Sequence, residues 1–434
     1  MTEPLAPPRP LRVLCVLRVW VPALVLFAAA TVLLNWRTVR DLNTQRPAPE
    51  PSTLRYAGVM TANDTLAFSF HLTNSTEAVK RGTVYFPLSD FDCPITFLVP
   101  GGLLQWATGW PPIRVINVFT LVAVFLNGVA AFGLMRSGGA AGPVAAIAAV
   151  GYMAPNFVLY SQHMGHMNYV QVQWIAFTFW GLLATVRAGA GWWPAVGLGL
   201  AMGLQLLSSP SFALYLAYVA LPLFAVTHWC VAPRPRPQLL GLALRGTVAV
   251  AVALAVAGAY LFPRMGAMPG RFDVPGPSFT WNHLGELFDP AHPTLFVGVG
   301  LFALGVLAGR WCCSNRSPAV AAALVTMCVA TLCMLPAISG TPYWALREYA
   351  PLFDRMRVPT RFIPIVILML LAPISWYLTA SAERRTWATW GYAALLFLAL
   401  LCNWLLSSWV CGYVIEQPPA KFNIVLPLAP PGPR

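Results

Sequence analysis

The sequence is poor in charged residues, and in acids above all. Asp, Glu, Lys and Arg make up 9% of its 434 residues, with 14 acidic against 27 basic side chains. Soluble domains carry about a quarter charged residues. This deficit, with 58% hydrophobic residues and a mean hydropathy of +0.66, excludes a soluble globular domain. The composition predicts an all-α polytopic membrane protein.

Three further signals are missing from the sequence. No small-residue cleavage site follows the first apolar stretch, so we expect an uncleaved first span and not a signal peptide. The nine cysteines show neither a disulfide framework nor metal-ligand spacing. The net charge of +13 comes without a nucleic-acid-binding motif, so we expect no nucleic-acid partner. A divalent ion could help to bind a phosphate, but the sequence offers no ligand set for it.

Apolar segments dominate the chain. A helix that crosses a bilayer needs about 20 apolar residues, and about eleven segments approach or exceed that length. They lie at 13–35, 113–134, 140–159, 169–187, 192–208, 211–231, 239–262, 293–309, 318–337, 360–380 and 387–411. The crowded region 140–231 could contain a half-span. We therefore assign 13–411 to one transmembrane domain with helical extracytoplasmic loops and no large soluble domain.

Charge sorts the short loops between these segments. Every second loop is basic, and the arginines concerned are Arg136, Arg187, Arg234, Arg236, Arg310, Arg316, Arg384 and Arg385. Basic loops stay on the cytoplasmic side of a membrane. The pattern therefore predicts a cytoplasmic N-terminus at 1–12, an outer loop at 36–112 and an extracytoplasmic, Pro-rich tail at 412–434.

The outer loop 36–112 carries the first candidate for function, Asp64, beside the apolar run Leu66–Leu72. An acid this close to a bilayer is costly to desolvate and is a functional candidate by default. The alternation within the run suggests a strand by period alone, whereas the spacing of Glu77 and Lys80 favours a helix. We expect short helices at the membrane interface, with Asp64 as a catalytic base that faces outward.

A polar stretch containing His163 and His166 ends one expected span, and Gln171 lies at the entry of the next. Polar groups at this depth require partners. They either cap and hydrogen-bond neighbouring helices or form a ligand-facing wall, in which His166 donates to a sugar or phosphate oxygen. The two histidines are three residues apart, as in a metal pair, but no acid lies near them in the sequence.

The outer loop at 338–361 breaks the charge rule, because it carries several arginines, including Arg357 and Arg361. Guanidinium groups match phosphate oxygens in a two-pronged fashion. We therefore expect Arg357 and Arg361 to form an anion clamp at the mouth of the next span. The alternative is that both side chains snorkel to lipid headgroups.

Taken in order, these features resemble a known family. They are Asp64 in the first outer loop, Gly165-His166 followed by Gln171 and Trp174, and the run Arg357-Val358-Pro359-Thr360-Arg361-Phe362. From about Asp64 to Leu371, the sequence resembles bacterial membrane glycosyltransferases of the GT-C superfamily.

The resemblance implies an enzyme of the bacterial cytoplasmic membrane, with its active site facing outward. Such an enzyme transfers a sugar, with expected inversion, from a polyprenyl-phosphate donor to a glycan, lipid or protein acceptor. Asp64 would be the general base, Arg357 and Arg361 would hold the phosphate, and the substrate-binding residues would include His163, His166 and Gln171.

Two departures from the family pattern leave alternatives open. Many relatives have paired acids where this chain has Asn63-Asp64, and many continue into a soluble outer domain in place of a short tail. A non-catalytic homologue acting as a membrane scaffold is one alternative. A flippase for lipid-linked sugars is less favoured, because transporters are expected to show internal repeats and no convincing repeat is visible.

Overall fold

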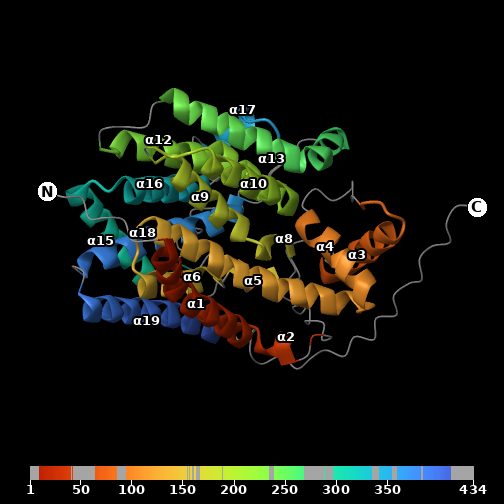
Figure 1. Ribbon diagram of the computed structural model, residues 1–434, viewed down its shortest axis with the longest axis horizontal. Helices are drawn as coiled ribbons and strands as arrows, with labels where there is room; N and C mark the ends of the chain where they lie inside the picture. The colour runs from red at the N-terminus through yellow and green to blue at the C-terminus, as the bar shows by residue number, and fades with distance from the viewer. Residues whose placement is uncertain are drawn as a thin grey trace, which may run out of the picture.

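The computed structural model is helical throughout the part of the chain that it describes, and no described residue lies in a strand (Figure 1). The described residues are 9–40, 42, 64–85, 94–153, 155, 157–158, 161–162, 167–187, 189–233, 239–267, 288, 297–334, 342–353, 359–382 and 385–411. The predicted all-α class is confirmed.

The first group of helices runs to the middle of the chain. It comprises α1 (Arg9–Leu34), α2 (Trp36–Arg40), α3 (Asp64–Lys80), α4 (Ile95–Thr108), α5 (Pro112–Ser137), α6 (Gly142–Met153), α8 (Met167–Val170), α9 (Gln173–Thr185) and α10 (Trp193–Ser208).

The remaining helices complete the bundle. They are α11 (Pro210–Tyr215), the π-helical η2 (Leu216–Ala220), α12 (Leu221–Val231), α13 (Leu239–Ala267), α15 (Val299–Asn315), α16 (Pro318–Cys333), α17 (Pro342–Tyr349), the 3-10 turn η4 (Pro359–Phe362), α18 (Ile363–Ser381) and α19 (Thr386–Cys411).

Six helical stretches of the described chain are long and apolar enough to cross a membrane. They are Leu17–Leu34, Pro112–Ser137, Pro210–Val231, Leu239–Pro263, Ile363–Ser381 and Thr386–Leu406. Helices α6, α10 and α16 are apolar but shorter. The chain is thus a polytopic helical membrane protein. In the expected span 140–159, helix α6 ends at Met153, and Phe157 and Val158 beyond Pro155 are again helical.

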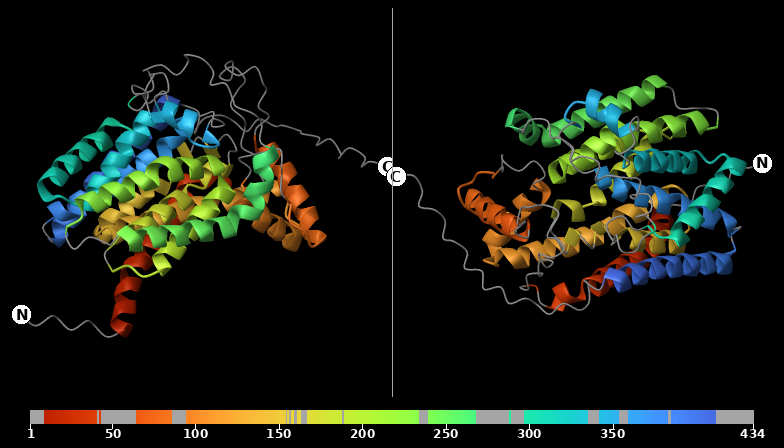
Figure 2. Two further views of the ribbon diagram at one scale, coloured as in Figure 1. Left: turned by 90° about the horizontal axis from the view of Figure 1, so that it is seen from above. Right: turned by 180° about the vertical axis from the view of Figure 1, so that it is seen from behind.

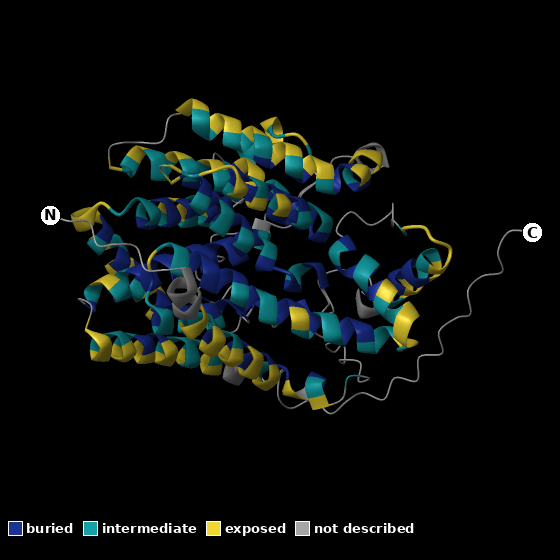
Figure 3. Cartoon of the chain, viewed as in Figure 1, coloured by how far each residue is buried: buried dark blue, intermediate teal, exposed yellow. Residues whose placement is uncertain are grey.

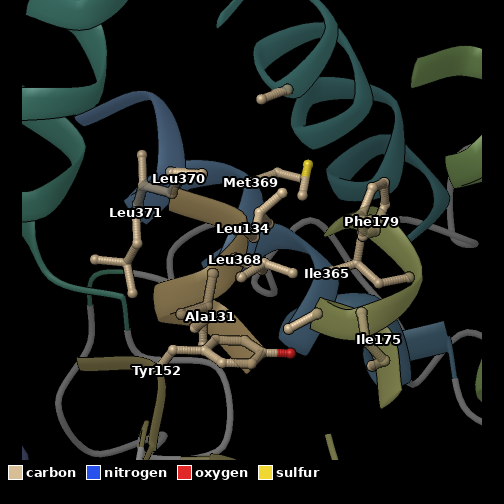
Figure 4. Close-up of a cluster of buried hydrophobic side chains, with 14 of the residues drawn as sticks. Ala131, Leu134, Tyr152, Ile175, Phe179, Ile365, Leu368, Met369, Leu370 and Leu371 are labelled. Carbon is tan, nitrogen blue, oxygen red and sulfur yellow. The ribbon is translucent and has the colours of Figure 1, made fainter. Parts of the chain in front are cut away.

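Helix α18 forms the centre of the bundle. Most of its side chains are buried, and α5, α6 and α9 pack around it with α16. Figure 4 shows Tyr152 of α6 and Phe179 of α9 converging with Leu368 of α18 in this core. In contrast, α13 and α19 are largely exposed and present apolar side chains outward, as helices that face lipid do (Figure 3).

Small residues allow α10 and α13 to approach closely. A Cβ built on Gly199 would lie 2.4 Å from the carbonyl oxygen of Ala249, and one on Gly203 would lie 2.7 Å from Cβ of Val256. The two glycines are four residues apart, which places them on one face of α10. This is the small-xxx-small pattern of helix contacts in membranes.

Two of the basic loops that predicted the topology, those after α5 and after α9, meet at one end of the bundle. Arg187 donates a hydrogen bond to the carbonyl of Ser137, and the amide of Ala141 donates to Thr379 Oγ1 at 2.8 Å. Helix α5 leads from this end to α3 and α4 at the other end, and both views in Figure 2 agree with this separation. The segments therefore alternate between two ends, while their orientation across the membrane stays a prediction.

Candidate functional site

The expected span 169–187 is interrupted at its start. Helix α8 ends at Val170, α9 begins at Gln173, and the two residues between them are not helical. Asn127 Nδ2 donates to the carbonyl of Val170 at 3.1 Å, and the Tyr152 hydroxyl donates to the carbonyl of Val172 at 3.1 Å. Asn127 thus adds a buried partner at the carboxyl end of α8, and Tyr152 adds one at the start of α9, where the Val172 carbonyl also accepts from the amides of Ile175 and Ala176.

Gln171 lies in this break and is 5% exposed. Its Oε1 accepts a hydrogen bond from Thr96 Oγ1 at 2.8 Å, and its Nε2 donates to the carbonyl of Met167 at 3.3 Å. The interhelical hydrogen bonding that the sequence left as one alternative is therefore present. Gln171 holds α4 of the outer loop 36–112 against the break between α8 and α9.

Helices α3 and α4 form a layer over this end of the bundle. Ser75 Oγ donates to the carbonyl of Leu98 at 2.8 Å, and Gly102 lets α4 approach Ser75 closely. Phe68 of α3 belongs to the same apolar cluster as Met167 of α8. The sequence prediction of a helix in preference to a strand is confirmed here, since the apolar run lies inside α3.

Asp64 is the first residue of α3, one helical turn before Phe68. Phe68 shares an apolar cluster with residues of α4, α5, α8 and α13, so α3 packs against these helices at Phe68. The position of the Asp64 side chain, like the residues His163, His166 and Arg357, falls outside the described part of the chain.

Arg361 is half-buried at the end of η4, where the chain enters α18. Its Nη1 donates to Ser211 Oγ at 2.8 Å, and its Cζ lies 4.6 Å from the ring centroid of Tyr169. A cation over an aromatic face is stabilised by the ring quadrupole. Arg361 therefore connects α11 and α8 with the start of α18.

Aromatic packing fixes this arrangement. Phe362 stacks on Tyr215 at 4.2 Å between ring centroids, and Tyr215 immediately precedes the π-helical segment. Such segments occur often at functional sites. In α17 beside them, burial raises the pKa of Tyr343, although the positive charge of Arg347 lowers it. Tyr343 thus stays a neutral packing group at physiological pH.

Unpartnered polar atoms mark the same region. Gln173 Oε1, Gln205 Oε1 and Ser208 Oγ are buried and have no hydrogen-bond partner among the described residues. Buried polar groups without a protein partner call for a water or a ligand. Gln173 stands out in the sequence as a polar residue within an apolar span, whereas the sequence prediction missed Gln205 and Ser208, together with Thr96, Tyr169 and Ser211. The polar run Ser208–Ser211 at the start of an apolar segment was the signal that could have revealed part of it.

Gln171 and Arg361 thus both lie at the short helix α8. Gln171 directly follows the last residue of α8, and Arg361 lies over the ring of Tyr169 in α8. Within the described residues, no group of three His, Cys, Asp or Glu side chains could hold a metal ion.

Comparison with known proteins shows a similarity of fold but not of sequence. No family model matches the sequence, and no curated protein matches it. The fold is similar to that of the crystal structure of the Archaeoglobus fulgidus oligosaccharyltransferase in the apo form, with a TM-score of 0.55 and 12% sequence identity. The similarity covers 91% of this chain and 55% of the archaeal one, so the chain spans about half the length of that protein. The fold is of the GT-C type.

Proposed function

We propose that this protein is a membrane glycosyltransferase that moves a sugar from a polyprenyl-phosphate donor to an extracytoplasmic acceptor. The acceptor is a glycan, a lipid or a protein, and the membrane is the bacterial cytoplasmic membrane. The observation that carries the proposal is the placement of Arg361, which Tyr169 of α8 and Ser211 of α11 hold in place, while Met167 of α8 shares an apolar cluster with Phe68 of α3. The GT-C type of fold supports it.

The chemistry is a displacement at the anomeric carbon of the sugar. The incoming hydroxyl needs a base, which contributes about 10²–10⁴-fold when well positioned. The departing phosphate needs fixed positive charge, which in many enzymes is the larger contribution. The new bond forms between the acceptor oxygen and the anomeric carbon, while the bond from that carbon to the phosphate oxygen breaks with inversion.

We assign one role to each residue. Asp64 takes the proton of the acceptor hydroxyl. Arg361, with Arg357, binds the phosphate before and after it departs. His163 and His166 contact the sugar or the phosphate. Gln171 acts through Thr96, since both polar ends of its side chain are engaged; it positions the outer-loop helices over the donor.

The test is incubation of the purified protein, in liposomes, with a panel of labelled polyprenyl-phosphate sugars and a membrane extract as acceptor. We expect label transfer from at least one donor, and loss of transfer in Arg361→Ala. The matched control is Arg310→Ala, which removes an exposed arginine at the carboxyl end of α15. A folded protein that transfers no label from any donor would contradict the proposal and support a non-catalytic scaffold.

A further inference from the structure

The turn that follows α17 inserts the side chain of Phe353 among three tyrosines. The ring centroid of Phe353 lies 5.5 Å from that of Tyr215 in α11 and 5.7 Å from that of Tyr343 in α17. It lies 6.4 Å from that of Tyr218 in the π-helical η2. Phe353 is fully buried. One side chain of this turn thus joins α11, η2 and α17.

This aromatic cluster reaches Arg361 through two neighbouring contacts between α11 and η4. Ser211 and Tyr215 are four residues apart, so they lie on one face of α11. Arg361 Nη1 donates to Ser211 Oγ at 2.8 Å, and the ring of Phe362 stacks on Tyr215 at 4.2 Å. The stack of Phe362 on Tyr215 therefore fixes the backbone from which the adjacent Arg361 extends.

The turn that carries Phe353 adopts a strained conformation. Leu352 has a φ of 68°, in the left-handed region, where a bulky residue is an outlier. The Tyr218 hydroxyl donates to the carbonyl of Pro351 at 3.2 Å, and the amide of Phe353 donates to that of Ala350 at 3.1 Å. Strained backbone persists only where the surrounding contacts over-determine it. Burial of the Phe353 ring is the contact that holds this turn in place.

We propose that Phe353 is a positioning residue for Arg361. Phe353 packs against Tyr215, and Tyr215 packs against Phe362. This stack fixes the backbone at Arg361, so that the guanidinium group meets the donor phosphate in one orientation. The inference rests on the proposed function, which assigns the phosphate to Arg361. Phe353 acts through its neighbours and not by touching the donor.

The test removes the ring of Phe353 and keeps the apolar character of the side chain. Phe353→Leu removes the contact with Tyr215. Phe132→Leu is the matched control, because it removes an equally buried ring that packs on Phe27 of α1 and not on the cluster. Thermal unfolding in detergent checks that both variants are folded.

Chemical modification of arginine reports on Arg361 in the absence of any donor. Phenylglyoxal reacts fastest with guanidinium groups that are free to reorient, and peptide mass spectrometry gives the rate at each arginine. In Phe353→Leu, the rate at Arg361 should rise about two- to tenfold, the factor that corresponds to the loss of one aromatic pair. The rate at Arg310, which is exposed on α15, is the internal reference. Phe132→Leu should leave both rates at the parent values.

Two further substitutions test the turn while the ring of Phe353 stays in the chain. Leu352→Val introduces a β-branched side chain, which tolerates a positive φ poorly, so the rate at Arg361 should rise. Leu352→Gly should leave that rate at the parent value, because glycine adopts this φ readily. Tyr218→Phe keeps every ring and loses only the hydrogen bond to Pro351, so it should raise the rate less than Phe353→Leu does. Equal rates in the two Leu352 variants would contradict the proposal.

Donor binding gives the measurement that a merely structural role would not move. A labelled polyprenyl phosphate in nanodiscs should bind Phe353→Leu about two- to tenfold more weakly than the parent protein. The same substitution made in Arg361→Lys should cost no further affinity, because residues that act through one another are not additive, whereas independent residues are. An equal loss in both backgrounds, or no loss in either, would overturn the proposal.

The two measurements separate this inference from the proposed function. A raised modification rate at Arg361 in a protein that binds no donor would keep the positioning role of Phe353 and reject the glycosyltransferase proposal. Unchanged modification and unchanged donor binding in Phe353→Leu would reject the positioning role and leave the glycosyltransferase proposal in place.

Discussion

The guanidinium carbon of Arg361 lies 4.6 Å from the centroid of the Tyr169 ring. The two residues are 192 positions apart (361 − 169) in the sequence. Ser211 accepts a hydrogen bond from the same guanidinium group. The ring of Tyr169 and the hydroxyl of Ser211 together fix the plane of the Arg361 guanidinium group. Binding of a phosphate by two parallel hydrogen bonds requires such a fixed plane.

The first prediction concerns this guanidinium group. Arg361→Lys keeps the charge but loses the fork and the stacking, so donor affinity should fall about tenfold. In Arg361→Ala, which also loses the charge, donor affinity should fall further. Binding of a labelled polyprenyl phosphate in nanodiscs measures both, with Arg310→Ala as the control. Equal affinities for the parent and both Arg361 variants would identify Arg361 as a purely structural residue.

The second prediction concerns the hydrogen bond between Thr96 and Gln171. Thr96→Val leaves the buried Oε1 of Gln171 without this donor, which should cost about 1–3 kcal/mol of stability. Thr108→Val is the control, because the Thr108 hydroxyl is exposed and bonds only nearby backbone, the carbonyl of Leu104 and the amide of Trp110. Unfolding in detergent measures the stability of both variants. If Thr96→Val is as stable as the control, the hydrogen bond does not hold α4 in place.

The third prediction concerns the contact between α10 and α13. Gly199→Ala would force a methyl group against the carbonyl of Ala249, so we expect destabilisation by about 1–3 kcal/mol. Gly197→Ala, two residues away, meets open space and should stabilise α10 by about 0.5–1 kcal/mol, because glycine is a poor helix former. Thermal unfolding of the two variants should shift in opposite directions. Shifts of the same sign would contradict the close helix contact.

The sequence predicted the class of fold, because that class depends on composition, while the sorting of loops by charge stays a prediction. The break between α8 and α9 could not be predicted in this way. It depends on Asn127 and Tyr152, which lie in other helices and bond carbonyls of the break. From the sequence, the same stretch was one apolar span, and the possible half-span in 140–231 was the nearest indication.

Part of the candidate site was also visible in the sequence. Arg361 stood out because it violated the charge rule of its loop, and Gln171 because it was polar within an apolar span. Their partners did not stand out. Tyr169 and Thr96 are ordinary residues in their local context, and they gain a role only through contacts across the fold.

The fourth prediction is the orientation of the protein. Ser89 in the outer loop and Ser137 at the opposite end of α5 should differ in access from outside the cell. Each is changed to cysteine in turn and labelled with a membrane-impermeant maleimide, with the parent protein as background. We expect labelling of Ser89→Cys alone. Labelling of Ser137→Cys but not of Ser89→Cys would reverse the topology.

The fifth prediction concerns Asp64, the first residue of α3. Asp64→Asn is nearly isosteric, but it cannot accept a proton at neutral pH. Turnover should fall by about 10²–10⁴-fold, while donor affinity and thermal stability stay close to the parent values. Glu77→Gln is the control on the same helix, since Glu77 is exposed and pairs with Lys80.

The most direct measurement is single-turnover transfer of sugar from a saturating polyprenyl-phosphate donor by the parent protein, Asp64→Asn and Glu77→Gln, with donor binding measured on the same samples. The account predicts that all three bind donor alike, that the parent and Glu77→Gln transfer sugar at similar rates, and that Asp64→Asn transfers almost none. Near-normal transfer by Asp64→Asn would contradict the role of Asp64 as the base.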